Sequence, residues 1–135
     1  MAENISFKNF MSPKSRTAKI QISDLKLRTI IGTNDWERTT KQEVLINISL
    51  EHNATKAIAT DNLKDTVDYR ALTKRIIKEV EGSRFLLLEK LTDYVLNIVM
   101  ENPKVKNATV RIDKPRALRF ARSVSVELSA KRSNA

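Results

Sequence analysis

Hydrophobic and polar residues alternate along several stretches of the chain, most clearly over residues 44–51. In that stretch an apolar residue returns at every second position, as Val44, Ile46, Ile48 and Leu50. A period of two predicts a β-strand with one buried face. The pattern also predicts a first strand from about Ala18 to Ile31, interrupted near Ser23-Asp24 and closed by Gly32. Together the two strands would form a long hairpin, and later strands are predicted near residues 105–112 and 124–128.

Between these pairs of strands the apolar period lengthens to that of an α-helix. One helical stripe starts at Tyr69 and ends near Gly82, and a second starts at Leu88 and stops before Asn102-Pro103. Residues 54–60 are expected to form a short helical turn. The order strand, strand, helix, helix, strand, strand predicts an α+β fold, in which a four-stranded antiparallel sheet carries both helices on one face.

A sheet of this kind leaves its edges and one face uncovered. Exposed strand edges invite pairing with another chain. Association of subunits into a larger sheet or a closed barrel would cover both the edges and the open face. We therefore expect a homo-oligomer.

The length of 135 residues suits a single domain, which we place at residues 19–131 after a flexible N-terminal tail, residues 1–18. The first nineteen residues have no continuous apolar core, so no secretory signal is expected. The chain has no apolar run of about 20 residues, the length that a membrane helix needs. Cysteine is absent, which excludes disulfides and thiolate sites and is compatible with a cytoplasmic setting.

The formal net charge of +9 indicates a polyanionic or phosphorylated partner. Part of the excess lies near the two ends of the chain, where charges are usually solvated. A denser basic run extends from Arg111 to Arg122. A nucleic-acid-binding module is one interpretation, but aromatic residues are only 5% and none interleave as a stacking motif. A phosphorylated small molecule is the other interpretation.

Common catalytic motifs are missing. Gly32 and Gly82 are the only glycines, so neither a phosphate-binding loop nor a serine elbow is present, and His52 is the only histidine, which argues against a metal site. Acid–base chemistry would then fall to Lys, Tyr, Glu or Asp. Four candidates lie where predicted elements begin or end: Glu37, Tyr69, Glu89 and Lys114. Taken alone, each has an ordinary explanation as a solvated charge, a core aromatic or a first-turn carboxylate.

Read together, the motifs are more specific. Gly32 with Glu37 and Gln42, then Thr66-Val67-Asp68-Tyr69, then Leu87-Leu88-Glu89-Lys90-Leu91, then Ile112-Asp113-Lys114 follow in order along residues 20–130. This series resembles the dihydroneopterin aldolase family. Arg84-Phe85, Tyr69-Arg70 with Thr73-Lys74, and residues 114–119 with 123–125 are similar to the epimerases of that family, which act on dihydroneopterin triphosphate.

The resemblance implies a tunnelling fold, in which subunits form a barrel with sites between neighbours, most often as an octamer of two tetramers. It implies a pterin substrate and a retro-aldol reaction that needs no cofactor or metal. Glu89 would bind the pterin ring, together with the backbone near Leu88 and with Val67 and Asp68 of a neighbouring subunit. Lys114 would be the general base, Tyr69 a proton relay, and Glu37 a ligand of the side-chain hydroxyls.

The segment after Lys114 departs from the aldolase pattern. Aldolases usually carry a longer, proline-rich stretch there, whereas this chain has the arginine-bearing residues 116–122. Guanidinium groups suit a phosphorylated side chain, and Arg119 is the first candidate for that contact, followed by Arg116 and Arg122. The resemblance thus favours 2'-epimerisation of dihydroneopterin triphosphate, with the aldolase reaction of folate biosynthesis as the alternative.

Overall fold

The computed structural model describes residues 14–133, and five strands in it form one sheet. The strands are β1 (Thr17–Ile31), β2 (Gln42–Asn53), β3 (Arg84–Phe85), β4 (Val105–Pro115) and β5 (Ser123–Lys131). Two long helices, α3 (Tyr69–Glu81) and α4 (Leu88–Met100), lie in the chain between β2 and β4. Short helical segments η1 (Asp35–Arg38), α2 (Thr55–Thr60) and η2 (Leu63–Asp65) occupy the connections. The α+β class is confirmed.

Along the sheet the strands lie in the order β3-β1-β2-β4-β5. The four long strands are antiparallel neighbours, as predicted. The predicted count of four strands was wrong, because β3 adds a fifth. Its two residues pair in parallel with the end of β1, Arg84 opposite Ile30 and Phe85 opposite Ile31. Two residues are too few for an alternating pattern to show in a sequence.

The predicted interruption of the first strand is a β-bulge. The register of β1 against β2 shifts between Ile22 and Leu25, and Asp24 has a φ of 53°. The Asp24 amide donates to Asn47 Oδ1 at 2.9 Å, so a β2 side chain replaces a backbone acceptor. A bulge of this kind bends the strand and increases its twist.

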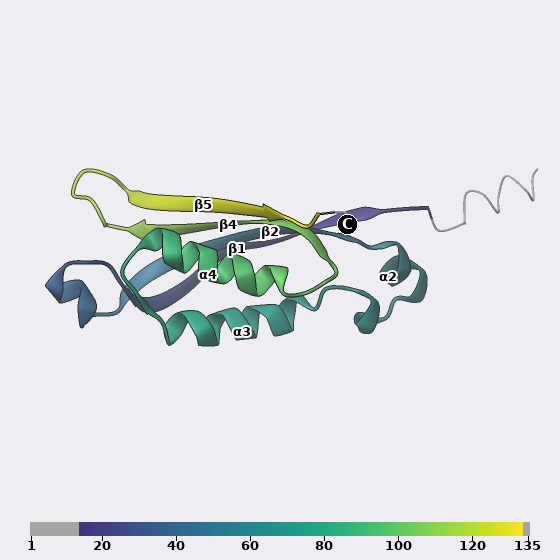
Figure 1. Ribbon diagram of the computed structural model, residues 1–135, viewed down its shortest axis with the longest axis horizontal. Helices are drawn as coiled ribbons and strands as arrows, with labels where there is room; N and C mark the ends of the chain where they lie inside the picture. Colours follow the sequence, from purple (N-terminus) through teal and green to yellow (C-terminus); the bar gives the residue numbers. More distant parts are fainter. Residues whose placement is uncertain (1–13, 134–135) are drawn as a thin grey trace, which may run out of the picture.

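Helices α3 and α4 lie on one face of the sheet, and the other face is open (Figure 1). Helix α3 packs against β1, while α4 packs against β4 and β5. Alternate residues of the two central strands face the helices and are fully or almost fully buried: Val44, Ile46, Ile48, Leu50, Val110 and Ile112. Each such side chain contributes about 1.5 to 3 kcal/mol by leaving water. A slip of one residue would expose the whole row, so this burial fixes the register.

The connections gather at two opposite ends of the sheet (Figure 1). The connection containing η1, the β4–β5 hairpin and the start of α4 share one end, which we call the hairpin end. The segment with α2, η2 and the start of α3 lies at the other end, which we call the α2 end. Helix α3 has 13 residues and spans about 20 Å, so it separates side chains at the two ends.

Most of the expected N-terminal tail lies outside the described residues. Of its last residues, Thr17 and Ala18 already belong to β1 and pair with Asn53 and His52. The Arg16 amide donates to Thr55 Oγ1 at 2.9 Å. Strand β1 therefore begins slightly before residue 19.

Candidate active site

An ion pair lies at the hairpin end of the sheet. Glu37, in η1, is only 5% exposed, and Lys114 is the last residue but one of β4. Lys114 Nζ donates to Glu37 Oε2, although 77 positions separate the two residues in the chain. The structure thus brings two of the candidate residues into direct contact.

Two further donors hold the Glu37 carboxylate. Gln42 Nε2 donates to Oε2 at 2.9 Å, and the Asn34 amide donates to Oε1 at 3.2 Å. Asn34 caps η1, so the contact is half of a capping box. Gln42 Nε2 also donates to the Ile31 carbonyl at 2.6 Å. Glu37 is therefore anchored to the ends of β1 and β2 before any ligand arrives.

The protonation of Glu37 reflects these contacts. Burial raises the pKa of Glu37, but the hydrogen bonds from Lys114, Gln42 and Asn34 together outweigh it, so the pKa lies below the ordinary 4.5. Glu37 is thus a carboxylate at neutral pH. An anion in this position suits an acceptor, or a partner for an ammonium group, better than a proton donor.

Gly32 makes room for this carboxylate. Its φ is 129°, a conformation that residues with a Cβ rarely adopt. A Cβ at this position would collide with the carboxylate group of Glu37. The glycine that closes β1 is therefore required both by the backbone turn and by the close approach of Glu37.

The η1 connection is tied to β3. Arg38 donates to the carbonyls of Gly32 at 3.0 Å, Phe85 at 3.1 Å and Arg84 at 2.7 Å. Arg84 donates in return to the Arg38 carbonyl at 2.8 Å. These contacts hold the segment before α4 against the segment that carries Glu37.

A second polar cluster supports the base of the β4–β5 hairpin. Asp113 is 4% exposed and accepts from Arg111 Nε at 3.0 Å and from Ser123 Oγ at 2.7 Å. Burial raises the pKa of Asp113, but these hydrogen bonds and the charges of Arg111 and Arg122 outweigh it, so the pKa lies below 3.8. The cluster joins β4 to β5 one residue before Lys114.

The start of α4 offers donors and a carboxylate at the same end. Leu87 occupies the N-cap and provides no side-chain hydrogen bond, and the first intrahelical bonds come from the amides of Lys90 and Leu91. The preceding amides, of Leu88 and Glu89, have no intrahelical acceptor. Glu89 is exposed in this first turn and Leu88 is half-buried.

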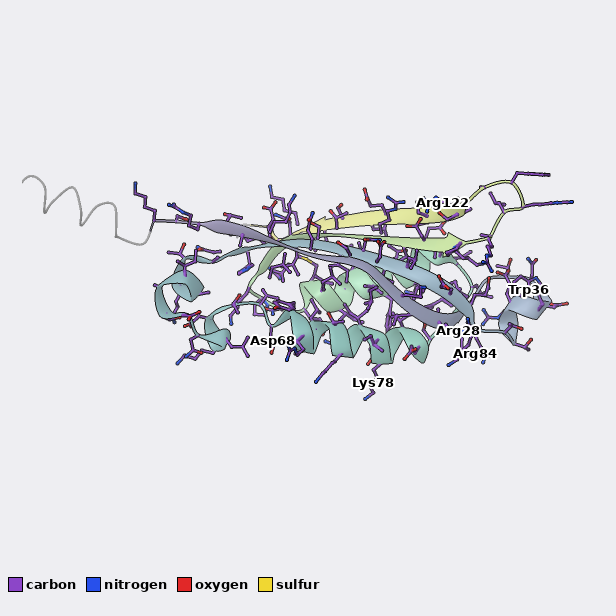
Figure 2. The ribbon with its side chains drawn as sticks, turned by 180° about the vertical axis from the view of Figure 1, so that it is seen from behind. Arg28, Trp36, Asp68, Lys78, Arg84 and Arg122 are labelled. Carbon is purple, nitrogen blue, oxygen red and sulfur yellow. The ribbon has the colours of Figure 1, made fainter. Side chains whose placement is uncertain are left out.

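Tyr69, Val67 and Asp68 lie elsewhere in the same chain. They form the entry to α3, and Figure 2 shows Asp68 far from Arg28, Arg84 and Trp36, which gather at the hairpin end. Tyr69 is 57% exposed, Val67 is 1% exposed, and Asp68 caps α3 by accepting from the Ala71 amide at 3.0 Å. One chain therefore holds the candidate residues as two separate groups.

The three candidate arginines differ in their surroundings. Arg116 has a φ of 63° and its amide donates to the Arg122 carbonyl at 3.3 Å, closing the hairpin. The Arg119 guanidinium lies 5.4 Å from the centre of the Phe120 ring, and Phe120 is 94% exposed. The charge of Arg122 acts on Asp113.

For several other residues of the site, the sequence alone predicted no role. Gln42 and Gly32 entered it only as members of a motif, and Asn34 and the Asp113–Ser123 contact were absent from it. Asn34 had a local signal, a capping residue three positions before a glutamate. The Asp113–Ser123 contact spans a hairpin whose register the sequence alone does not give.

Comparison with known proteins assigns the chain to a family. Residues 20–129 match the model of the dihydroneopterin aldolase family. The chain belongs to that family. It is 47% identical over 115 residues to the dihydroneopterin triphosphate 2'-epimerase of Pseudomonas aeruginosa, covering 85% of this chain and 94% of that protein. The Escherichia coli epimerase is 46% identical over 115 residues, with coverages of 85% and 96%.

Solved structures of the family have the same fold. The Escherichia coli dihydroneopterin aldolase in complex with neopterin is similar with a TM-score of 0.79 at 26% identity, covering 84% of this chain and 98% of that one.

Within residues 14–133, no group of three or more His, Cys, Asp or Glu side chains could hold a metal ion. No helix in this part of the chain is long and apolar enough to cross a membrane.

Proposed function

We propose that this chain is an epimerase that inverts the 2' carbon of 7,8-dihydroneopterin 3'-triphosphate, giving 7,8-dihydromonapterin 3'-triphosphate. The observation that carries the proposal is the Lys114–Glu37 ion pair at the same end of the sheet as the start of α4, in a chain 47% identical to an epimerase. The pair supplies a proton acceptor and an anion that stabilises it. The α4 start supplies a carboxylate and free amides for a ring.

The pterin ring would be bound at the start of α4. The Glu89 carboxylate would accept from the ring N3–H and the exocyclic amine, two parallel donors of the geometry that carboxylates bind well. The amide of Leu88 or Glu89 would donate to the ring carbonyl. Val67 and Asp68 of a neighbouring subunit would add backbone contacts.

The chemistry would be a reversible retro-aldol cleavage. Lys114 in its neutral amine form, directly or through a water, takes the proton of the 2'-hydroxyl and becomes an ammonium, and the C1'–C2' bond breaks. Its electron pair moves onto C1' and into the ring imine, while C2' becomes an aldehyde. Glu37 stays anionic, stabilises the protonated Lys114 and holds the side-chain hydroxyls. The aldehyde then turns and re-adds by its other face, which inverts C2' and returns the proton.

Tyr69 would relay a proton at C1'. Since Tyr69 lies at the α2 end and Lys114 at the hairpin end, we propose that the site is completed by a second subunit. Tyr69, Val67 and Asp68 would come from one copy, and Glu37, Glu89 and Lys114 from its neighbour. An octamer of two stacked tetramers, each closing the open sheet faces into a barrel, would place the two groups together.

The second candidate function is the dihydroneopterin aldolase reaction, favoured by the family match over residues 20–129. It shares the first half of the mechanism. If C1' is protonated and the aldehyde leaves, the products are glycolaldehyde and 6-hydroxymethyl-dihydropterin. The two reactions differ in whether the site retains the cleaved fragment.

Chiral analysis of the products separates the two functions. Purified protein would be incubated with dihydroneopterin, with and without its triphosphate, and the products resolved on a chiral column. We expect the inverted triphosphate as the main product. Glycolaldehyde as the main product, without inversion of the triphosphate, would replace the epimerase proposal by the aldolase one.

A further inference from the structure

A cavity at the hairpin end has two arginines in its wall. It has a volume of about 290 Å³ and is lined by Arg28, Trp36, Gln42, Glu43, Pro115 and Arg116. Two of the lining residues connect it to the ion pair. Gln42 donates to Glu37, and Pro115 directly follows Lys114. The cavity therefore adjoins the groups proposed to cleave the C1'–C2' bond.

Arg28 reaches this cavity from β1. Its neighbours Leu27 and Thr29 are buried against the helices, so strand alternation turns Arg28 to the open face of the sheet. One guanidinium nitrogen donates to the Lys41 carbonyl at 3.0 Å, which holds the side chain in place. A guanidinium has five N–H donors, so most of them remain for a ligand.

Arg116 reaches the same cavity from the hairpin. It follows Pro115 in a left-handed turn, φ 63°, which changes the direction of the chain directly after β4. The two arginines are far apart in the sequence: Arg28 belongs to β1, and Arg116 lies in the turn between β4 and β5. Two guanidinium groups on one cavity match the oxygens of a polyphosphate, which favour bidentate donors.

One residue in the wall of the cavity, Glu43, carries a negative charge that disfavours the binding of an anion. Glu43 lies opposite Arg28 on β2, and its carboxylate is 3.9 Å from Lys26 Nζ. The wall of the cavity therefore carries two positive charges, from Arg28 and Arg116, and one negative charge, from Glu43. The exposed Lys26 partly neutralises the charge of Glu43. Removing the Glu43 charge should strengthen the binding of an anion, which gives a test in the opposite direction.

We infer that Arg28 and Arg116 bind the triphosphate of the substrate and thereby keep the cleaved fragment in the site. The inference rests on the proposed function and names its phosphate-binding residues. Arg119 and Arg122 are placed differently, against Phe120 and near Asp113. Arg28, in the middle of a predicted strand, was not among the arginines that the sequence singled out.

Binding measurements test the inference without relying on turnover. Calorimetry on the full chain would compare neopterin triphosphate, unphosphorylated neopterin and inorganic tripolyphosphate. We expect Arg28→Gln and Arg116→Gln each to weaken the binding of the triphosphate by about 10- to 100-fold, and that of neopterin by much less. Glu43→Gln should tighten the binding of the triphosphate. Arg75→Gln, which removes one exposed arginine on α3, is the control and should change neither.

The possible outcomes are distinct. Equal losses for neopterin and its triphosphate, or no loss in either arginine variant, would overturn the inference. So would a wild-type protein that binds neopterin triphosphate no tighter than neopterin. If Arg28→Gln does not fold, Arg28→Lys keeps the charge without the planar fork, and Arg116→Gln still decides. If the protein binds the triphosphate selectively but does not epimerise it, the phosphate-binding inference stands and the proposed function fails.

Discussion

At the scale of single residues, the proposed proton transfer depends on the pair of Lys114 and Glu37. An anion beside a lysine stabilises its ammonium form, which is the form that the Lys114 amine takes once it has accepted the proton of the substrate hydroxyl. Glu37 is such an anion, because its pKa is lowered and its own position is fixed by Gln42 and Asn34. The division of roles follows from this geometry: Lys114 would move the proton, and Glu37 would hold the charge.

Replacing Lys114 by Ala should therefore remove turnover and leave binding. A positioned general base contributes about 10²- to 10⁴-fold, so kcat should fall by at least that factor. The pterin ring contacts would remain, so the Kd for neopterin measured by fluorescence should change little. Lys78→Ala, on the exposed side of α3, is the matched control (Figure 2). Full activity in Lys114→Ala would remove the proposed mechanism.

Gly32 leads to a prediction that depends on shape rather than charge. In Gly32→Ala the added Cβ would displace the Glu37 carboxylate, and the positive φ would cost about 1 to 3 kcal/mol of stability. We expect a large fall in kcat together with a lower urea midpoint. Gly82→Ala is the control, because the nearest atom to its Cβ would be the Lys78 carbonyl oxygen at 3.4 Å. A Gly32→Ala protein as active and stable as Gly82→Ala would contradict the packing described here.

At the scale of elements, the sequence predicted what repeats and missed what is short or non-local. Rows of alternating apolar residues predicted the four long strands, the helical stripes predicted α3 and α4, and the polar Ser23-Asp24 predicted the interruption that the structure shows as a bulge. Strand β3 has only two residues, and it is held by contacts of Arg38 with distant carbonyls. Contacts of that kind leave no periodic trace along the chain.

The candidate site divides in the same way. Glu37, Glu89 and Lys114 became candidates because their motifs follow one another in the family order, yet the contact between Glu37 and Lys114 appears only in the fold. Arg28 was missed because, within its strand, it is one polar residue among several. Only the register of β1 on β2 and of β2 on β4 brings it to the cavity that Arg116 also lines.

The β4–β5 hairpin should depend on Asp113 in a pH-dependent way. A carboxylate whose folded pKa is lowered stabilises the protein above its unfolded pKa, 3.8 for Asp113, and this contribution is lost as pH falls through the folded pKa. Asp113→Asn should therefore reduce the free energy of unfolding by about 1 to 3 kcal/mol near neutral pH. The difference from wild type should shrink below about pH 3.8. Urea titrations at both pH values measure this, and a difference that grows in acid would contradict it.

At the scale of the whole molecule, the two groups of candidate residues lie at opposite ends of one chain. Helix α3 carries Tyr69 at its start and leads towards β3 at the hairpin end, so bending a loop cannot bring Tyr69 to Lys114. A second copy of the chain would also cover the open face and the edges of the sheet described here. Assembly would then be a condition of activity rather than an addition to it.

Mixing two inactive variants tests this requirement. Tyr69→Phe and Lys114→Ala subunits should each be inactive alone. If every site takes Tyr69 from one chain and Lys114 from another, random co-assembly should restore about a quarter of the sites. Differently tagged subunits, co-expressed and purified through both tags, would show that mixed oligomers form, and the chiral assay would measure the recovered rate.

The control for this experiment uses two residues of the same end. Glu37 and Lys114 contact each other within one chain, so co-assembled Glu37→Gln and Lys114→Ala subunits contribute only sites that lack one of the two. No recovery is expected from that mixture, whereas the Tyr69→Phe and Lys114→Ala mixture should recover. If both mixtures stay inactive although mixed oligomers are present, Tyr69 and Lys114 do not meet across subunits, and the shared site would have to be abandoned.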